Sequence, residues 1–454
     1  MDLGFETIGN ATLICHDRGP VLVTDPWTDG PAYFGAWNFS HTIPDEQRSH
    51  ILDAKFVWLS HGHPDHMSAQ SLRPLSEKTF LVPDHVGGRI KKSLEDKGLK
   101  VQVLEDRKWI TLSDRIRVFC IADYNQDGVL LVDLDGTLVV NLNDASDRGW
   151  GRLLKKIIGG YKKSILMRLS GYGDADMIHC FDEAGILIPP VAAKKFLPGK
   201  QIQSMAERLG CRFFIPFSSM HVWQREDSVW VDPYVTTLED YKKGFASDTC
   251  ELMNPFQRYD AIKDRFEDIN PPERPRKILP PSEFGDDWSE PLSQEDERKL
   301  EAYFKRFEHL SEAFDFIRFR VGGKEMEITF AQDKFKRGVT FEAPRSSLMK
   351  SVKWEIFDDM LIGNFMKTTM HGDPGIRPLY PDFTPYVAKY GDNGLARTRS
   401  ELNAYFAEYR RRAPLEHLFH TIETAAVDRF RDFFPMDSGF YKFAKGAYRL
   451  VKGG

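Results

Sequence analysis

Four side chains that can bind metal ions lie within six residues of this sequence: His61, His63, Asp65 and His66. They follow residues 55–60, whose apolar centre predicts a buried strand. Imidazole and carboxylate groups are common ligands of zinc and iron. The spacing lets His61 and His63 bind one ion while Asp65 and His66 bind a second ion close by. The segment therefore favours a two-metal centre over a solvated turn.

Each ion needs at least three or four donors, so further ligands must come from the ends of other strands. Asp144 follows the apolar strand predicted over 137–142 and is expected to bridge both ions. His221 follows the strand predicted over 212–217 and is expected to bind the second ion. Asp123 follows the strand predicted over 116–121 and is the default further donor to the first ion, because no histidine is nearby. A turn aspartate or a packed loop histidine is the alternative at each position.

The other histidines give weaker signals. His41 and His85 are expected to line the pocket or to be structural. The remaining histidines have no ligand-like context: His16, His50, His179, His309, His371, His417 and His420. Side chains that flank the predicted metal-bearing strand ends are candidates for substrate contact: Trp37, Arg148, Trp150 and Tyr172. Among these, Arg148 suits a small-molecule substrate that carries a phosphate or carboxylate group.

Composition bounds the class of protein. A chain of 454 residues predicts two or three domains. The net charge of −5 and the pI of about 6.3 give no basic field for nucleic acid. We expect no transmembrane helix, because no apolar run approaches the roughly 18 residues required, and no secretory signal is visible at the N-terminus. The five cysteines are odd in number and far apart, which predicts reduced thiols in a cytoplasmic protein.

The chain divides into three predicted segments. Residues 1–253 contain short strands with interspersed helices, which favours a layered α/β sandwich as the metal-binding domain. They include a predicted hairpin with its turn at 16–20, three successive strands over 116–142 and a helix whose N-cap is expected near Ser68. Residues 254–298 are rich in proline and charge and predict an extended connector or a strap over the first domain. Residues 299–454 predict an α+β domain. It begins with a hairpin around Gly322 and Gly323, continues with a helix and an apolar segment over 346–366, and ends in helical residues 397–434.

The HxHxDH loop formed by His61, His63, Asp65 and His66 resembles that of the metallo-β-lactamase superfamily. This resemblance implies a four-layer αββα sandwich that holds two divalent metal ions: zinc, iron or manganese. The segments Ile8–Ile14 and Val23–Trp27 look like the branch that contains ascorbate-phosphate lactonases and N-acyl-phosphatidylethanolamine phospholipases.

A closer resemblance is to CMP-N-acetylneuraminate hydroxylases, through residues 25–41, 141–146 and 215–217. Those hydroxylases carry a Rieske iron–sulfur domain, and its Cys-x-His and Cys-x-x-His ligands are absent from this sequence. The family's third histidine for the first ion falls on Asp123, and an oxygen donor there favours iron or manganese over zinc. Residues 314–366 also faintly resemble sterol-carrier-like domains.

Three functions follow as expectations. The first is a binuclear metal-dependent hydrolase, in which a metal-activated hydroxide attacks an ester, lactone or phosphodiester and Asp65 and Asp144 are catalytic. The second is a di-iron oxygenase resembling the hydroxylases, with a separate reductase as electron donor. The third is a lipid- or partner-binding protein with a vestigial metal site, whose basic and aromatic tail at 440–450 touches a membrane.

Overall fold

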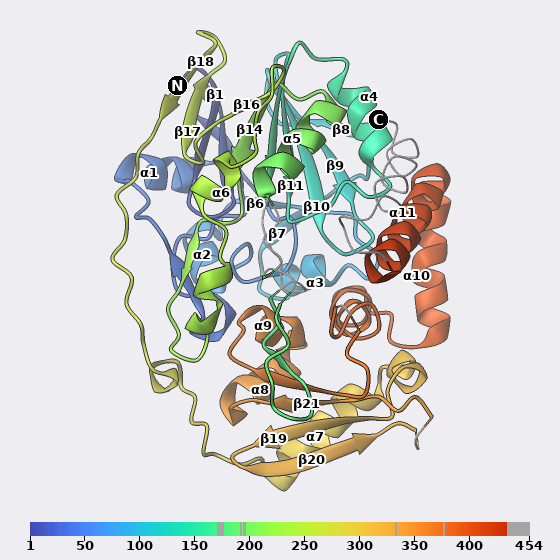
Figure 1. Cartoon of the computed structure of the whole chain (residues 1–454). Coiled ribbons are helices and arrows are strands. Elements are labelled where there is room, and N and C mark those ends of the chain that lie inside the picture. The colour runs from blue at the N-terminus through green and yellow to red at the C-terminus, as the bar shows by residue number, and fades with distance from the viewer. Residues whose placement is uncertain (170–176, 191–192, 194–196, 332–333, 376, 434–454) are drawn as a thin grey trace.

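The structure is a computed structural model of the whole chain. It describes every residue except 170–176, 191–192, 194–196, 332–333, 376 and 434–454. Two large sheets face each other in the upper part of Figure 1, and a third sheet lies below them. Tyr172 and the tail at 440–450, which the sequence singled out, lie outside the described residues.

The first large sheet is mixed and has eight strands. Its antiparallel part comprises β1 to β3 with β17 and β18, and β3 continues into the parallel strands β5, β6 and β7. In spatial order the strands are β18 (Arg265–Asp268), β17 (Gln257–Asp260), β1 (Leu3–Ile8), β2 (Thr12–Asp17), β3 (Pro20–Thr24), β5 (Phe56–Trp58), β6 (Thr79–Pro83) and β7 (Lys100–Leu104). The hairpin predicted around residues 16–20 is confirmed by the pairing of β2 with β3.

The second large sheet has seven strands and is likewise half antiparallel and half parallel. In spatial order they are β16 (Glu251–Leu252), β14 (Phe213–Pro216), β12 (Lys163–Arg168), β11 (Thr137–Asn143), β10 (Gly128–Leu134), β9 (Ile116–Ala122) and β8 (Trp109–Thr111). The three successive strands predicted over 116–142 are confirmed as β9, β10 and β11.

Three hydrophobic cores show that these sheets are the inner layers of a four-layer sandwich. Between the sheets, side chains such as Leu13 and Trp58 of the first pack with Val118 and Val139 of the second. The opposite face of the first sheet packs on α1 (Asp45–Asp53) and α3 (Arg89–Glu95). The opposite face of the second packs on α4 (Gly151–Ile158), α5 (Pro198–Leu209) and α10 (Arg399–Arg412). The predicted αββα sandwich is confirmed.

Short helices and one small ribbon complete this part of the chain. The helix α2 (Ala69–Leu72) begins after Ser68, whose hydroxyl accepts a hydrogen bond from the Ser71 amide, as the sequence predicted for its N-cap. The helix α5 ends at Gly210, which has a left-handed conformation. The remaining elements are α6 (Leu238–Lys242) and the two-stranded ribbon of β4 (Trp37–Phe39) and β15 (His221–Trp223).

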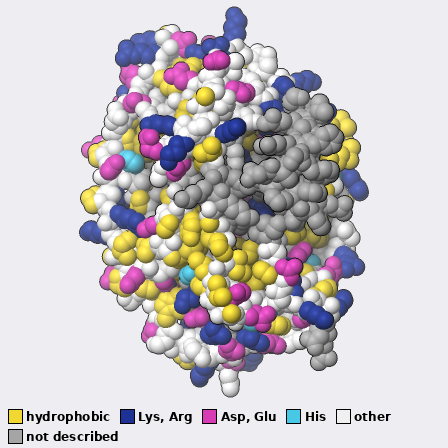
Figure 2. Space-filling view, viewed as in Figure 1, with side chains coloured by type: hydrophobic (Ala, Val, Ile, Leu, Met, Phe, Trp, Pro, Cys, Tyr) yellow, Lys and Arg dark blue, Asp and Glu magenta, His cyan; other side chains and the backbone are white. Residues whose placement is uncertain are grey.

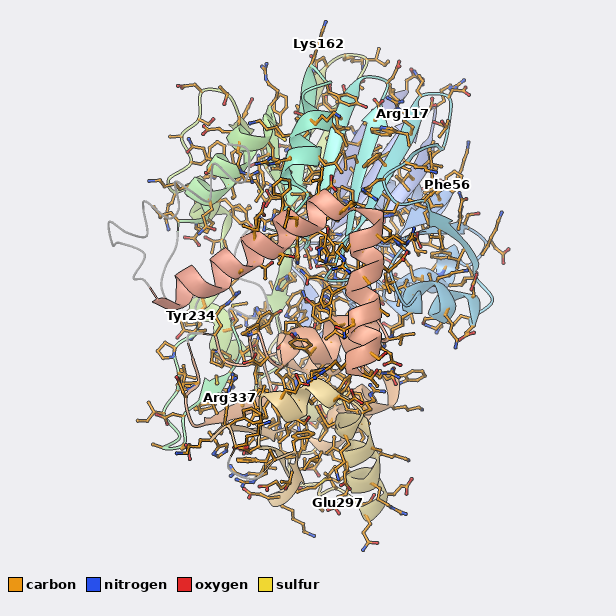
Figure 3. All side chains as sticks on the ribbon, turned by 90° about the vertical axis from the view of Figure 1, so that its right-hand side faces the viewer. Phe56, Arg117, Lys162, Tyr234, Glu297 and Arg337 are labelled. Atoms are coloured by element: carbon orange, nitrogen blue, oxygen red, sulfur yellow. The ribbon has the colours of Figure 1, made fainter. Side chains whose placement is uncertain are left out.

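The third sheet forms the core of the C-terminal part, together with α7 (Gln294–Lys305), α8 (Arg345–Trp354) and α9 (Phe357–Ile362). Its strands in spatial order are β13 (Cys180–Phe181), β22 (Lys367–His371), β21 (Gly338–Glu342), β19 (Phe316–Val321) and β20 (Lys324–Thr329). The predicted hairpin is confirmed by the pairing of β19 with β20. The π-helix Pro385–Asn393, α10 and α11 (Pro414–Phe433) follow, and Figure 3 shows α10 and α11 along one side of the molecule.

Strands from different predicted segments pair with each other in the same sheet. β13 comes from the first segment but pairs with β22 of the C-terminal sheet. β17 and β18 lie in the segment predicted as a connector, and β17 extends the first large sheet by pairing with β1. Residues 271–293 do run in a mostly extended course along the left side of Figure 1.

The surface in Figure 2 carries charged side chains of both signs over its upper and lower ends. Hydrophobic side chains gather near the middle of that face. Among the described residues, no helix combines the length and the hydropathy that crossing a bilayer demands.

Candidate metal centre

The loop that carries the predicted ligands leaves β5 and is fixed by buried polar contacts. The Ser60 amide donates a hydrogen bond to Oδ1 of Asp25 at 2.8 Å. The Ser60 hydroxyl lies 2.8 Å from Nδ1 of His61, which leaves Nε2 of His61 to face the centre. Gly128 permits this packing, because a Cβ atom there would lie 2.9 Å from the Ser60 carbonyl oxygen and 2.7 Å from Pro83. The loop is therefore held against the β9–β10 turn.

The structure brings the first two predicted ligands together with Asp144. Nε2 of His61 lies 2.8 Å from Nδ1 of His63 and 3.8 Å from Oδ2 of Asp144. One ligand atom from each of these residues lies within 4.8 Å of the others. Burial strongly lowers the pKa of His61, so its imidazole is neutral and able to bind a metal ion.

The second pair of predicted ligands also lies close to Asp144. Nε2 of His66 is 3.1 Å from Oδ2 of Asp65 and 3.4 Å from the same Asp144 oxygen that approaches His61. Asp144 follows Asn143, whose φ of +55° turns the chain at the end of β11. Asp144 thus approaches a histidine of each predicted pair, and its bridging role stays a prediction.

Asp65 is buried and oriented by two donors. The Tyr33 hydroxyl donates to its Oδ1 at 2.5 Å, and the Asn10 side-chain amide donates to its Oδ2 at 2.8 Å. Burial alone would raise the pKa of Asp65, but the adjacent His66 charge and the hydrogen bonds lower it to about 2. The carboxylate is therefore ionised at neutral pH.

Asp25 contacts Nδ1 of His66, the ring nitrogen that does not approach Asp65 and Asp144. Its Oδ2 lies 3.4 Å from Nδ1 of His66 and accepts a 2.5 Å hydrogen bond from the Asn143 side chain. A carboxylate on the far nitrogen of a histidine fixes the ring and strengthens the near nitrogen as a ligand. Asp25 lies in a segment that carries the family resemblance, and no spacing in the sequence signals this contact with His66.

His221 lines the same cavity as His63 and Asp144. Its ring stacks on Trp37 with centroids 3.5 Å apart and an interplanar angle of 6°. Its buried Nδ1 has no hydrogen-bond partner among the described residues. Burial lowers the pKa of His221 to about 4, so the ring is neutral at pH 7. These features suit a metal ligand, and the ligand role stays a prediction.

The β9–β10 turn contains two aspartates, and they differ in environment. Asp123 directs its Oδ1 to the Tyr124 amide at 2.6 Å and to the Trp150 indole nitrogen at 3.2 Å. Asp127, which the sequence analysis did not consider, lines the cavity with Asp144. Burial raises the pKa of both carboxyls, that of Asp123 to about 7. Asp127 therefore lines the cavity whereas Asp123 does not, and a ligand role for either stays a prediction.

The cavity has a volume of about 150 Å³ and lies between the sandwich and the C-terminal part. The sandwich contributes Tyr33 and Trp37 in addition to three of the predicted ligands, His63, Asp144 and His221. The C-terminal part contributes Ile362, Asn364 and Lys389. Next to it, Oδ2 of Asp358 in α9 lies 3.2 Å from Nε2 of His63. The C-terminal part is thus a wall of the site.

The donor set fits divalent cations. Asp127 and Asp144 line the cavity, and Asp65 and Asp358 contact the histidines beside it. Burying several carboxylates without cations is costly. Oδ1 of Asp144, Oδ1 of Asp358 and Nδ1 of His221 are buried without hydrogen-bond partners among the described residues. Metal ions would satisfy such atoms, and oxygen and imidazole donors suit zinc, iron or manganese.

Other residues singled out from the sequence lie elsewhere. His85 is buried next to the loop without lining the cavity, and His41 bonds to the Ser40 hydroxyl. Trp150 holds Asp123, and Arg148 does not line the cavity. Of the substrate-contact candidates among the described residues, only Trp37 lines it.

Comparison with known proteins gives partial matches. No family model matches this chain. A cytidine monophosphate-N-acetylneuraminic acid hydroxylase from Danio rerio is 29% identical over 141 residues, which is 29% of this chain and 24% of that protein. The same enzyme from Asterias rubens is 28% identical over 142 residues, 29% of this chain and 22% of that protein. The match thus spans about a quarter of the curated relatives.

Three observations together support the predicted relationship to the metallo-β-lactamase superfamily. The evidence is the HxHxDH loop at the end of β5, the four-layer sandwich and the sequence similarity to the hydroxylases. Solved structures with similar portions include CmlA, a diiron β-hydroxylase from Streptomyces venezuelae (13% identity, 57% of this chain, 54% of that chain, TM-score 0.36). Another is an isothiocyanate hydrolase from Delia radicum gut bacteria (15% identity, 56% of this chain, 98% of that chain, TM-score 0.37).

Proposed function

We propose that this chain is a binuclear metal-dependent hydrolase that cleaves an ester, lactone or phosphodiester of a small molecule. The observation that carries the proposal is the position of Asp144, whose Oδ2 approaches both His61 and His66. A carboxylate that approaches both ligand pairs, His61 with His63 and Asp65 with His66, suits a bridged pair of cations. His61 and His63, with Asp127, would hold one ion, and Asp65, His66 and His221 would hold the other.

When bound, two such ions lower the pKa of water towards neutrality and stabilise negative charge on the substrate. Asp65 and Asp144 have different roles in this proposal. Both oxygens of Asp65 carry hydrogen bonds, so this residue holds its ion in a fixed position. Oδ1 of Asp144 is buried and unpartnered among the described residues, so it is the oxygen that can accept the water proton.

The cavity limits the substrate. A volume of about 150 Å³ admits only the reacting part of a molecule while the C-terminal wall stays in place. Lys389 brings an ammonium group to the lining, and Trp37 and Ile362 bring apolar surface. This combination suits a small substrate that carries a carboxylate or phosphate next to an apolar group.

A second candidate function is a di-iron oxygenase that receives electrons from a separate reductase. Two observations favour it. The curated relatives are hydroxylases by name. In addition, Asp127 and Asp358 add carboxylate oxygen near the first pair of histidines, which favours iron or manganese over zinc.

Metal analysis combined with two activity assays distinguishes these functions. Full-length protein from iron-rich and zinc-rich media is assayed for cleavage of chromogenic esters, lactones and phosphodiesters, and for oxygen uptake with a chemical reductant. The hydrolase proposal predicts cleavage that depends on zinc or manganese and is lost in Asp144→Asn. About two irons per chain with reductant-dependent oxygen uptake, and no cleavage, would replace it with the oxygenase.

A further inference from the structure

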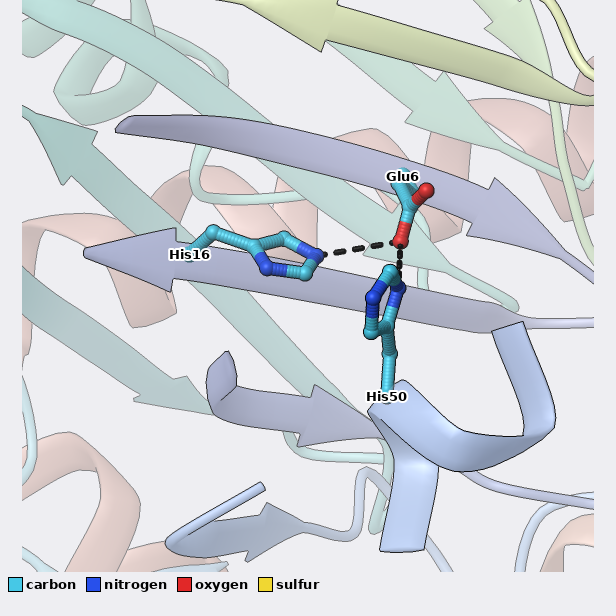
Figure 4. Close-up of side chains that lie close together, drawn as sticks. All are labelled: Glu6, His16 and His50. Atoms are coloured by element: carbon cyan, nitrogen blue, oxygen red, sulfur yellow. Dashed lines mark hydrogen bonds and ion pairs between the residues drawn. The ribbon is translucent and has the colours of Figure 1, made fainter. Parts of the chain in front are cut away.

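A second cluster of metal-binding side chains lies away from the proposed centre. Glu6 comes from β1, His16 from β2 and His50 from α1, as Figure 4 shows. Oε2 of Glu6 lies 3.0 Å from Nε2 of His16 and 2.7 Å from Nδ1 of His50. One ligand atom from each residue lies within 4.8 Å of the others. This cluster is on the helix-covered outer face of the first sheet.

The cluster has a buried side and an open side. Glu6 and His16 are 0% and 1% exposed, whereas the His50 side chain is 23% exposed. The two imidazole rings meet edge to face with centroids 4.8 Å apart. Two ligands are thus fixed within the sheet, and the third leaves access for an ion and a water molecule from solvent.

The other Glu6 oxygen is held by separate donors. Oε1 accepts hydrogen bonds from the Gln47 side chain at 2.9 Å and from Nε of Arg258 at 2.8 Å. Arg258 is also paired with Glu46 at 2.7 Å, so this trio of charged groups keeps a net negative charge. Burial would raise the pKa of Glu6, but His16, Gln47 and Arg258 lower it well below its ordinary value. Glu6 is therefore an oriented, ionised carboxylate.

We propose that Glu6, His16 and His50 form a separate binding site for one divalent cation of the zinc class. Two histidines and one carboxylate with an open fourth position are a common zinc-binding set. Nε2 of His16, Nδ1 of His50 and Oε2 of Glu6 already converge, and small rotations of the two rings make room for an ion at about 2.0–2.2 Å from each. Gln47 and Arg258 act as supports behind the carboxylate.

The site has a structural consequence. The ion would tie β1 and β2 to α1, three elements that Glu6 already connects. Binding only to the folded chain stabilises it in proportion to ion concentration. This inference does not depend on the hydrolase proposal, because none of its residues lines the cavity.

The test is zinc binding by full-length protein that has been stripped with a chelator and dialysed. Wild type should bind one equivalent more than His50→Ala. The matched control His41→Ala removes another partly buried histidine outside the cluster and should bind as wild type. His61→Ala, which damages the proposed centre, should still bind the equivalent assigned to the Glu6 cluster. The unfolding temperature of His61→Ala should rise with zinc, and this rise should be smaller in the His61→Ala/His50→Ala double variant.

Equal zinc content in wild type and His50→Ala would overturn the proposal and leave a hydrogen-bonded triad. Absence of a zinc-dependent rise in the unfolding temperature of His61→Ala would do the same. Gln47→Ala provides a milder variant that retains all three ligands. It should weaken zinc binding at this site about 10- to 100-fold, as loss of a supporting hydrogen bond does elsewhere, and unchanged affinity would count against the site.

Discussion

Oδ2 of Asp358 lies 3.2 Å from Nε2 of His63, although the two residues are 295 positions apart in the chain. His63 presents its other ring nitrogen to His61. A carboxylate on the outer nitrogen fixes the ring and makes the inner nitrogen a stronger ligand. The C-terminal part is therefore connected to the proposed metal chemistry by a specific contact as well as by the cavity wall.

This contact predicts a metal phenotype for a residue outside the sandwich. Asp358→Asn should weaken binding of the ion held by His61 and His63 by about 10- to 100-fold. The measurement is competition with a chromogenic chelator. Asp359→Asn is the matched control, because the pKa of Asp359 is raised by burial to about 7, so its carboxyl is already partly neutral. Equal affinity in wild type and Asp358→Asn would show that the contact has no influence on the ion.

The two aspartates of the β9–β10 turn should behave differently. Asp127→Asn should reduce metal content and activity, because Asp127 lines the cavity. Asp123→Asn should retain the metal and lower only thermal stability, because Asp123 accepts hydrogen bonds from Trp150 and Tyr124. Elemental analysis with thermal unfolding separates the two effects. The reverse pattern would restore Asp123 as the ligand that the sequence predicted.

A pH-dependent stability difference is expected at the start of α7. The desolvated Asp296 carboxylate pairs with Arg345 and caps the helix with Ser293, and its pKa is lowered to about 2 from 3.8. Since the folded pKa lies below the unfolded one, the stabilisation is complete above about pH 5. It is lost as the pH falls towards 2.

Asp296→Asn should therefore lower the free energy of unfolding by about 1 kcal/mol at pH 7. The difference from wild type should shrink to about half by pH 3, as measured by denaturant titration. Glu297→Gln, a half-buried acid in the same helical turn, should show little difference at either pH. A difference for Asp296→Asn that is independent of pH would contradict the charge-based explanation.

Much of the fold could be predicted because its signals are local. The HxHxDH loop, the three strands over 116–142 and the hairpin at Gly322 each depend on residues adjacent in sequence. The two-residue strand β13 could not be predicted as part of the C-terminal sheet, because its pairing with β22 crosses nearly 190 residues.

In the site, too, residues with a local sequence signal could be predicted and residues placed by long-range contacts could not. Asp144 and His221 were found because both follow apolar strands, and the structure places both at the cavity. The sequence does not reveal which aspartate of a tight turn lines a cavity, and so Asp127 was not among the predicted residues. Asp358 and the His16–Glu6–His50 cluster depend on tertiary contacts, so no sequence spacing signals them.

The central claim is that strand ends of two sheets hold a pair of cations bridged by Asp144. Its most direct test is the metal content of full-length wild type, His61→Ala and Asp144→Ala by elemental analysis, with His179→Ala as a control histidine that does not line the cavity. We predict that His61→Ala loses at least one ion per chain relative to wild type, that Asp144→Ala loses up to two, and that His179→Ala loses none. Full metal retention in both His61→Ala and Asp144→Ala would contradict the account.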